Sequence, residues 1–136
     1  MIYFHFETEP FEFSEESVRE WLNNLSMTHE KENGEINYIF CDDAYLLEMN
    51  IKYLNHNTLT DIISFDNSMG NLLEGDIFIS VERVEENAKE FGVDFRNELH
   101  RVMAHGLLHF AGFKDKTESE KEAMRKAEDE ALALRI

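Results

Sequence analysis

The sequence predicts a single compact α+β domain in which a small mixed sheet of about four strands packs with about five helices. The chain contains four short runs rich in β-forming residues and five segments whose apolar residues recur at helical spacing. The chain has 136 residues, a length that suits one apolar core, and no repeat or linker divides it. We therefore expect residues 1–136 to fold as one unit.

The first half of the chain is expected to hold two strand–helix units. Residues 2–6 are rich in β-forming residues, and a serine followed by two glutamates predicts a helix that begins near Ser14. A second strand is expected over 35–42 and a second helix from about Asp43. This order favours a parallel crossover between the two strands.

Two more strands are expected at 60–66 and 75–80. The eight residues between them are too many for a tight two-residue hairpin, but both runs are expected to pair within the same sheet. On the first of these strands, Ser64 should face opposite to Ile63 and Phe65. Its hydroxyl then faces either a cleft or a buried backbone group.

Three helices are expected in the remainder of the chain. Ser80 and Asp94 are suitable N-cap residues for the first two, and Gly92 can end the first. Thr117 and Glu120 match the capping-box pattern at the start of the last helix. The middle helix carries two histidines four positions apart.

The charge and cysteine content limit the possible functions. Asp and Glu number 29 against 13 Lys and Arg, and the formal charge of −16 works against long-range attraction to nucleic acid. The least acidic stretch is 114–126, with five basic and four acidic side chains. Cys41 is the single cysteine, which excludes an internal disulfide and a four-cysteine zinc site. Because no signal peptide or membrane span is recognisable, we expect a soluble, cytoplasmic protein with no membrane partner.

The stretch HGLLHFAGFKD, residues 105–115, predicts a metal site at a helix and the turn that follows it. His105 and His109 lie on one helix face, so both imidazoles can reach one ion. Gly112 can end the helix in a left-handed conformation, which would bring Asp115 back as a third ligand. Three ligands leave a position open for water, as in catalytic rather than structural zinc sites. One Zn²⁺ per chain is the expected cofactor.

Some features of this motif have a second interpretation. Two histidines and one carboxylate can also hold ferrous iron, and Asp115 can be a turn residue only. Gly106 stands where a zinc peptidase has its general base, which disfavours peptidase chemistry. A glycine within a helix indicates either clearance for a substrate or strand, or tight helix packing.

Four segments in order resemble the YbeY family of bacterial metal-dependent endoribonucleases, which act in ribosomal RNA maturation. They are MNIKYLNHNTLTDIISFD (49–66), GDIFIS (75–80), the Glu98-Leu99 pair and HGLLHFAGF (105–113). The resemblance implies a compact α+β fold with the metal helix beside the strand at 61–66. It also implies that a water activated by the metal cleaves single-stranded RNA during 16S ribosomal RNA maturation and ribosome quality control. The small ribosomal subunit and its proteins are the implied partners.

The sequence departs from the family pattern at two positions. The family's third histidine falls at Asp115, whose carboxylate remains an acceptable zinc ligand but is expected to weaken the Lewis acidity. The arginine that the resemblance assigns to the substrate phosphate is replaced by Leu54. Arg101, Lys114 and Lys116 are the candidates for that role, with a solvated surface charge as the alternative for each.

Two other functions fit parts of the sequence. The protein is either an enzyme of this kind, a ribosome-associated assembly factor with a structural metal, or, less in keeping with Gly106, a small zinc peptidase. The strong negative charge suits binding to basic ribosomal proteins. His56 is expected to be an exposed histidine in a loop or at a helix end, with a proton shuttle near the cleft as the alternative.

Overall fold

The computed structural model describes residues 1–135, which form four strands and five helices, as expected. In chain order these are β1 (Ile2–Phe6), α1 (Glu15–Thr28), β2 (Glu32–Cys41), α2 (Asp43–Leu54), β3 (Ile62–Asp66), β4 (Leu72–Ser80), α3 (Val81–Phe91), α4 (Phe95–Phe110) and α5 (Glu118–Ala133). Within this part of the chain, no helix combines the length and the apolarity needed to cross a membrane.

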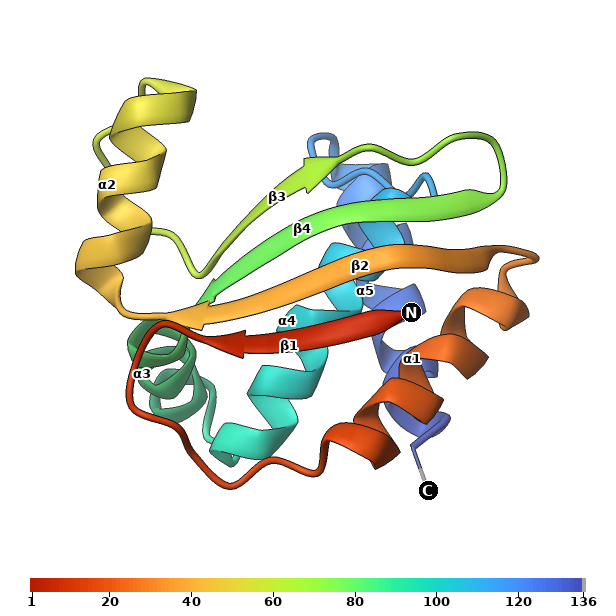
Figure 1. Cartoon of the computed structure of the whole chain (residues 1–136), viewed down its shortest axis with the longest axis horizontal. Coiled ribbons are helices and arrows are strands. Elements are labelled where there is room, and N and C mark those ends of the chain that lie inside the picture. The colour runs from red at the N-terminus through yellow and green to blue at the C-terminus, as the bar shows by residue number, and fades with distance from the viewer. Residues whose placement is uncertain (136) are drawn as a thin grey trace.

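The four strands form one mixed sheet in the order β1-β2-β4-β3 (Figure 1). The predicted crossover is confirmed, because β1 and β2 are parallel and α1 connects them. Strand β4 is parallel to β2, and β3 runs antiparallel to β4 at the edge of the sheet. The two β-rich runs in the middle of the chain therefore do pair with each other.

Two of these strands begin earlier than predicted. Strand β2 starts at Glu32 rather than 35, and β4 starts at Leu72 rather than 75. The extra residues pair with each other, Glu32 with Leu72 and Asn33 with Leu73, before an irregularity in the register. Glu32 and Asn33 are polar and so give no strand pattern in β2, although the backbone pairing with Leu72 and Leu73 does not depend on their side chains.

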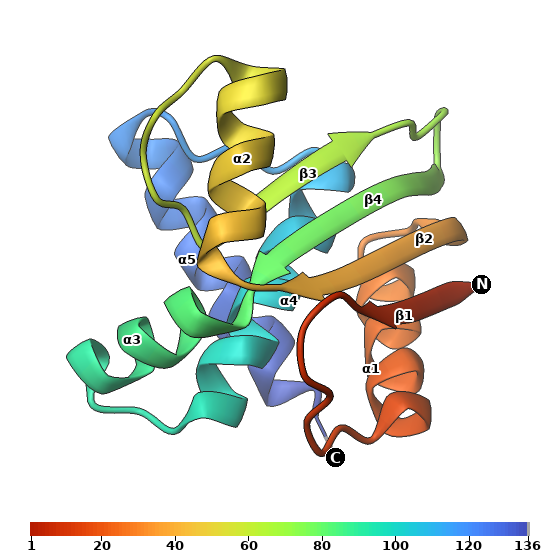
Figure 2. The same ribbon diagram turned by 60° about the vertical axis from the view of Figure 1, so that its left-hand side comes forward.

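The sheet separates two apolar cores. Helices α1, α4 and α5 cover one face, where alternate strand residues such as Tyr38 and Ile77 are fully buried. Helix α2 packs on the opposite face over a smaller core of Cys41, Leu46 and Ile63. Figure 2 shows α2 in front of the sheet and α4 and α5 behind it. The face that bears α4 is the one that holds the candidate site.

The predicted helix ends are present, with one difference in detail. Ser80 and Asp94 accept hydrogen bonds from the backbone of α3 and α4, and Thr117 closes a capping box with Glu120. Ser14 stands at the start of α1, but its hydroxyl donates to Ser17 Oγ (3.0 Å) and caps no backbone N–H. These caps determine where α4 and α5 begin, and so the position of the turn between them.

A buried hydrogen bond from Tyr38 on β2 joins helix α4 to the sheet. The Tyr38 hydroxyl donates a hydrogen bond to the Met103 carbonyl oxygen at 2.9 Å, within the buried core. Gly106 faces the same sheet surface, where a Cβ atom would lie 3.0 Å from Ile62 Cδ1 and 3.1 Å from Ile77. Close packing of the helix on strands β3 and β4 is therefore the role that the structure supports for Gly106, and not clearance for a substrate.

Candidate metal centre

Helix α4 presents His105 and His109 on one face, at the border between the core and the solvent. Their ring centroids are 4.7 Å apart and the rings are inclined at 77°. Their side chains are 21% and 32% exposed, whereas Leu107 and Leu108 between them are buried in the core. The amphipathic pattern of the helix thus places both imidazoles at a point that a solute can reach.

The chain reverses direction directly after α4. Gly112 adopts a φ of +109°, and the backbone N–H of Phe113 donates to the Leu108 carbonyl oxygen at 3.0 Å. The conformation at Gly112 is one that residues with a Cβ atom avoid. Asp115 consequently folds back over the end of the helix before Thr117 starts α5.

The structure brings the three predicted ligands together. Asp115 Oδ2 lies 3.2 Å from His105 Nε2 and 3.5 Å from His109 Nε2. One ligand atom from each of the three residues lies within 4.8 Å of the others. With bonds of about 2.0–2.1 Å, ligand atoms around a tetrahedral zinc are separated by roughly 3.3 Å. The two distances to Asp115 therefore fit a metal site of this kind.

The hydrogen bonding of His105 also favours a cation at this point. Its Nδ1 lies 2.7 Å from Glu128 Oε2, an acceptor, so Nδ1 carries the proton. In neutral His105, Nε2 then directs a lone pair at the Asp115 carboxylate oxygen 3.2 Å away. Two acceptors at this distance require a positive charge between them, which either a proton or a metal ion provides.

Without a metal, a proton on His105 would supply that charge. Burial lowers the pKa of the His105 imidazole, but the hydrogen bond and the negative charge of Glu128, with the nearby charges of Asp115 and Asp61, raise it above its ordinary value. The same negative surroundings that stabilise an imidazolium favour a divalent cation.

Glu128 is a site residue that the sequence reasoning missed. It lies on α5, and its side chain is 9% exposed. Its second oxygen, Oε1, accepts from Arg101 NH1 at 3.0 Å, and Arg101 NH2 contacts Asp129 Oδ1 at 2.7 Å. The signal in the sequence was a carboxylate at a core-facing position, four residues after Met124 and three before Ala131. A buried acid in such a position needs a partner, and His105 and Arg101 are its partners.

The metal centre opens into a cavity of about 430 Å³. Besides the three candidate ligands, its lining comes from β3 and the preceding loop and from α3, α4 and α5: Thr60, Asp61, Ile62, Ser64, Phe91, Glu98, Arg101, Val102, Arg125 and Glu128. Ser64 thus faces the cleft, the first of the two alternatives left open for it. Burial raises the pKa of the Asp61 carboxyl, and burial together with the charge of Asp61 raises that of Glu98.

The other residues singled out in the sequence lie outside this lining. Lys114 and Lys116 are exposed on either side of Asp115, and Leu54 and His56 are exposed at the end of α2 and just beyond it. Arg101 does line the cavity, but two carboxylates hold its guanidinium.

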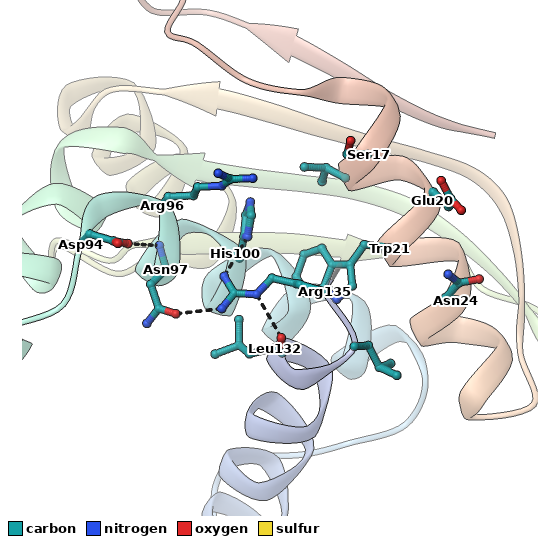
Figure 3. Close-up of a pocket in the computed structure, with 12 residues that line it drawn as sticks. Ser17, Glu20, Trp21, Asn24, Asp94, Arg96, Asn97, His100, Leu132 and Arg135 are labelled. Atoms are coloured by element: carbon teal, nitrogen blue, oxygen red, sulfur yellow. Dashed lines mark hydrogen bonds between the residues drawn. The ribbon is translucent and has the colours of Figure 1, made fainter.

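A larger cavity, of about 610 Å³, lies elsewhere, between α1, the start of α4 and the end of α5. Figure 3 shows Arg135 at its centre, bonded to the ring of His100, the side chain of Asn97 and the carbonyl of Leu132. Burial, followed by the positive charge of Arg135, lowers the pKa of His100 to about 4. This network holds a neutral histidine in a structural role, so size alone does not identify the functional cavity.

Comparison with known proteins agrees with the resemblance seen in the sequence. The sequence model of the family described as Endoribonuclease YbeY matches residues 3–134. A protein named Endoribonuclease YbeY from Flavobacterium johnsoniae is 56% identical over 134 residues, 98% of this chain and 96% of that protein. One of the same name from Bacteroides thetaiotaomicron is 48% identical and covers 85% of each chain.

The fold also has a counterpart of known structure. The solution structure of TM1509 from Thermotoga maritima superposes with a TM-score of 0.67 at 26% identity, over 98% of this chain and 90% of that one. The family match covers residues 3–134, and 56% identity over 98% of the chain to a member of that family agrees with it, so this chain belongs to the YbeY endoribonuclease family.

Proposed function

We propose that the chain is a single-domain, zinc-dependent endoribonuclease that cuts single-stranded RNA during maturation of 16S ribosomal RNA and in ribosome quality control. The observation that carries this proposal is the convergence of His105, His109 and Asp115 in the lining of a cavity, in a member of an endoribonuclease family. The reaction takes place in the cytoplasm, with the small ribosomal subunit and its proteins as partners.

In this proposal the three converging side chains hold one Zn²⁺. Bound there, the ion supplies Lewis acidity to a phosphoryl oxygen and lowers the pKa of a coordinated water toward about 7. Glu128 keeps the proton of His105 on Nδ1, so that Nε2 is the coordinating atom. Arg101 is a positioning residue for Glu128, because its guanidinium is bonded to that carboxylate and to Asp129. Lys114 and Lys116 are exposed beside Asp115 and are assigned to outer contacts with the RNA backbone.

Metal analysis and RNA cleavage on the same preparations test the proposal. Wild-type protein should contain one zinc per chain and cut a single-stranded oligoribonucleotide in preference to a duplex, and a chelator should abolish cleavage until Zn²⁺ is restored. The His109→Ala variant should lose both the zinc and the cleavage. Cleavage that continues at the wild-type rate in this variant would favour a contaminating nuclease, and with it the assembly-factor function.

A further inference from the structure

The cavity beside the metal centre contains two arginines, and one of them is already neutralised. Arg101 is 16% exposed and its guanidinium contacts Glu128 at 3.0 Å and Asp129 at 2.7 Å. A ligand phosphate would have to replace one of these carboxylates. Arg101 is therefore poorly placed to bind the substrate.

Arg125 lines the same cavity but is exposed and is not held in a close ion pair. Within residues 1–135, no carboxylate oxygen lies within 4.0 Å of its guanidinium. Its usual partner on a helix would be Asp129, four residues further on. That carboxylate is held by Arg101, so the ion pair on α5 that would neutralise Arg125 is not formed.

The position of Arg125 on α5 explains why its side chain reaches the cavity. It lies three residues before Glu128, about one helical turn nearer the start of α5, and so stands at the exposed border of the helix face that packs on α4. The start of α5 is connected to Asp115 through the cap at Thr117. Arg125 therefore joins the lining of the metal-centre cavity from the helix that directly follows the turn carrying Asp115.

The negative charge of the cavity requires a cation if a phosphate is to bind there. Four carboxylates, those of Asp61, Glu98, Asp115 and Glu128, line the cavity of a chain whose formal charge is −16. A phosphodiester that enters such a cavity meets repulsion unless cations compensate for it. Arg101 is neutralised and Lys114 and Lys116 stand outside the lining, which leaves Arg125 as the cation available within the described part of the cavity.

We propose that Arg125 binds a backbone phosphate of the RNA beside the metal centre. The inference rests on the proposed function and assigns the phosphate contact of that site. A guanidinium presents two parallel N–H donors to a phosphate, a geometry that the ammonium groups of lysines cannot reproduce. Arg125 thus both attracts the strand and fixes its orientation.

The test compares Arg125→Ala and Arg125→Lys with Lys126→Ala. Lys126 is the next residue on α5, is also exposed and is not part of the cavity lining, so its replacement removes one positive charge without the proposed contact. Binding of a fluorescent single-stranded oligoribonucleotide to metal-depleted protein is measured by anisotropy at several salt concentrations. The kcat and KM for cleavage are measured with zinc-loaded protein, and zinc content is determined for each variant.

Arg125→Ala should weaken RNA binding about tenfold relative to wild type and reduce the slope of log K against log salt by about 0.7, the value for one phosphate contact on a single strand. Arg125→Lys should keep the slope but regain only part of the affinity, because it keeps the charge and loses the fork of donors. Lys126→Ala should leave both nearly unchanged, and all three variants should bind zinc as the wild type does.

Two results would overturn the inference. Only the second of them would also overturn the proposed function. If wild-type protein cuts RNA while Arg125→Ala and Lys126→Ala agree in affinity, slope and KM, Arg125 has no role but the proposed function stands. If zinc-loaded wild type neither binds nor cuts the RNA, the proposed function fails and the inference fails with it.

Discussion

Glu128 Oε2 lies 2.7 Å from His105 Nδ1, so the last helix of the chain determines which nitrogen of this histidine faces the metal site. The contact spans 23 residues of sequence and joins α5 to α4. A carboxylate behind a metal-bound imidazole fixes the ring orientation and increases its basicity.

Glu128→Gln should lower zinc affinity by about 10- to 100-fold, the effect typical of removing the partner of a metal-bound histidine. The amide can still accept one hydrogen bond, but it loses the negative charge that His105 and Arg101 face. Competition with a chromophoric chelator at fixed pH measures the affinity. Glu130→Gln is the matched control, because Glu130 lies two residues further on in α5 and is exposed, and this variant should bind zinc like the wild type. Equal affinities for all three proteins would rule out the positioning role.

Asp115→Ala should reduce zinc affinity sharply, because it removes one of three ligands and leaves the two imidazoles of α4. Asp115→His should restore binding, since an imidazole nitrogen is an equally acceptable ligand. Equilibrium dialysis with zinc analysis distinguishes the three proteins. Full zinc stoichiometry and affinity in the alanine variant would show that Asp115 is only a turn residue.

Gly106→Ala should destabilise the fold by about 1 kcal/mol, even though alanine is the better helix former by a similar amount, because overpacking costs about 1–3 kcal/mol. The added methyl would lie 3.0 Å from Ile62 Cδ1 and 3.1 Å from Ile77 on the sheet. Urea unfolding of metal-free protein measures the change. Combining Gly106→Ala with Ile62→Val, which removes the nearest methyl group, should cost less than the sum of the two single changes. A single variant more stable than wild type would contradict the packing role of Gly106.

His100 should make folding stability fall as the pH drops from about 6.5 to 4. Its pKa is about 4 in the folded chain, because of burial and then of the charges of Arg135 and Arg96, which outweigh that of Asp94. In the unfolded chain it returns to its ordinary value near 6.5. Between these values the unfolded state takes up a proton that the folded state does not, so acid favours unfolding.

The measurement for His100 is the free energy of unfolding in urea for wild type and His100→Gln across this pH range. The difference between the two proteins should be constant above pH 7 and should shift in favour of the variant as the pH falls to about 4, since the glutamine has no proton to gain. Acidic groups common to both proteins cancel in this comparison. A difference that does not change with pH would mean that His100 is protonated alike in both states.

The elements of the fold could be predicted from the sequence because each has a local signal. The capping residues Ser80, Asp94 and Thr117 stand where helices begin, and alternation of apolar residues reveals the strands. The early start of β2 has no such signal. There, the polar residues Glu32 and Asn33 are held by backbone pairing with a strand 40 positions away.

The candidate site likewise has a part that could be predicted from local sequence and a part that could not. His105, His109, Gly112 and Asp115 lie within eleven residues, and helix geometry with one turn is enough to bring them together. The contact of Glu128 with His105 and the ion pair of Arg101 with Glu128 depend on how α5 packs against α4. No local spacing in the sequence reveals that packing.

The position of Cys41 has a consequence for oxidation. Its side chain is fully buried in the smaller core, and burial, followed by the charges of Asp42 and Asp43, raises the pKa of its thiol to about 12. Peroxides and disulfides react with thiolates, and almost none is present here at neutral pH. The candidate ligands are nitrogen and oxygen atoms, so oxidants that expel zinc from thiolate sites have no sulfur to attack at this centre.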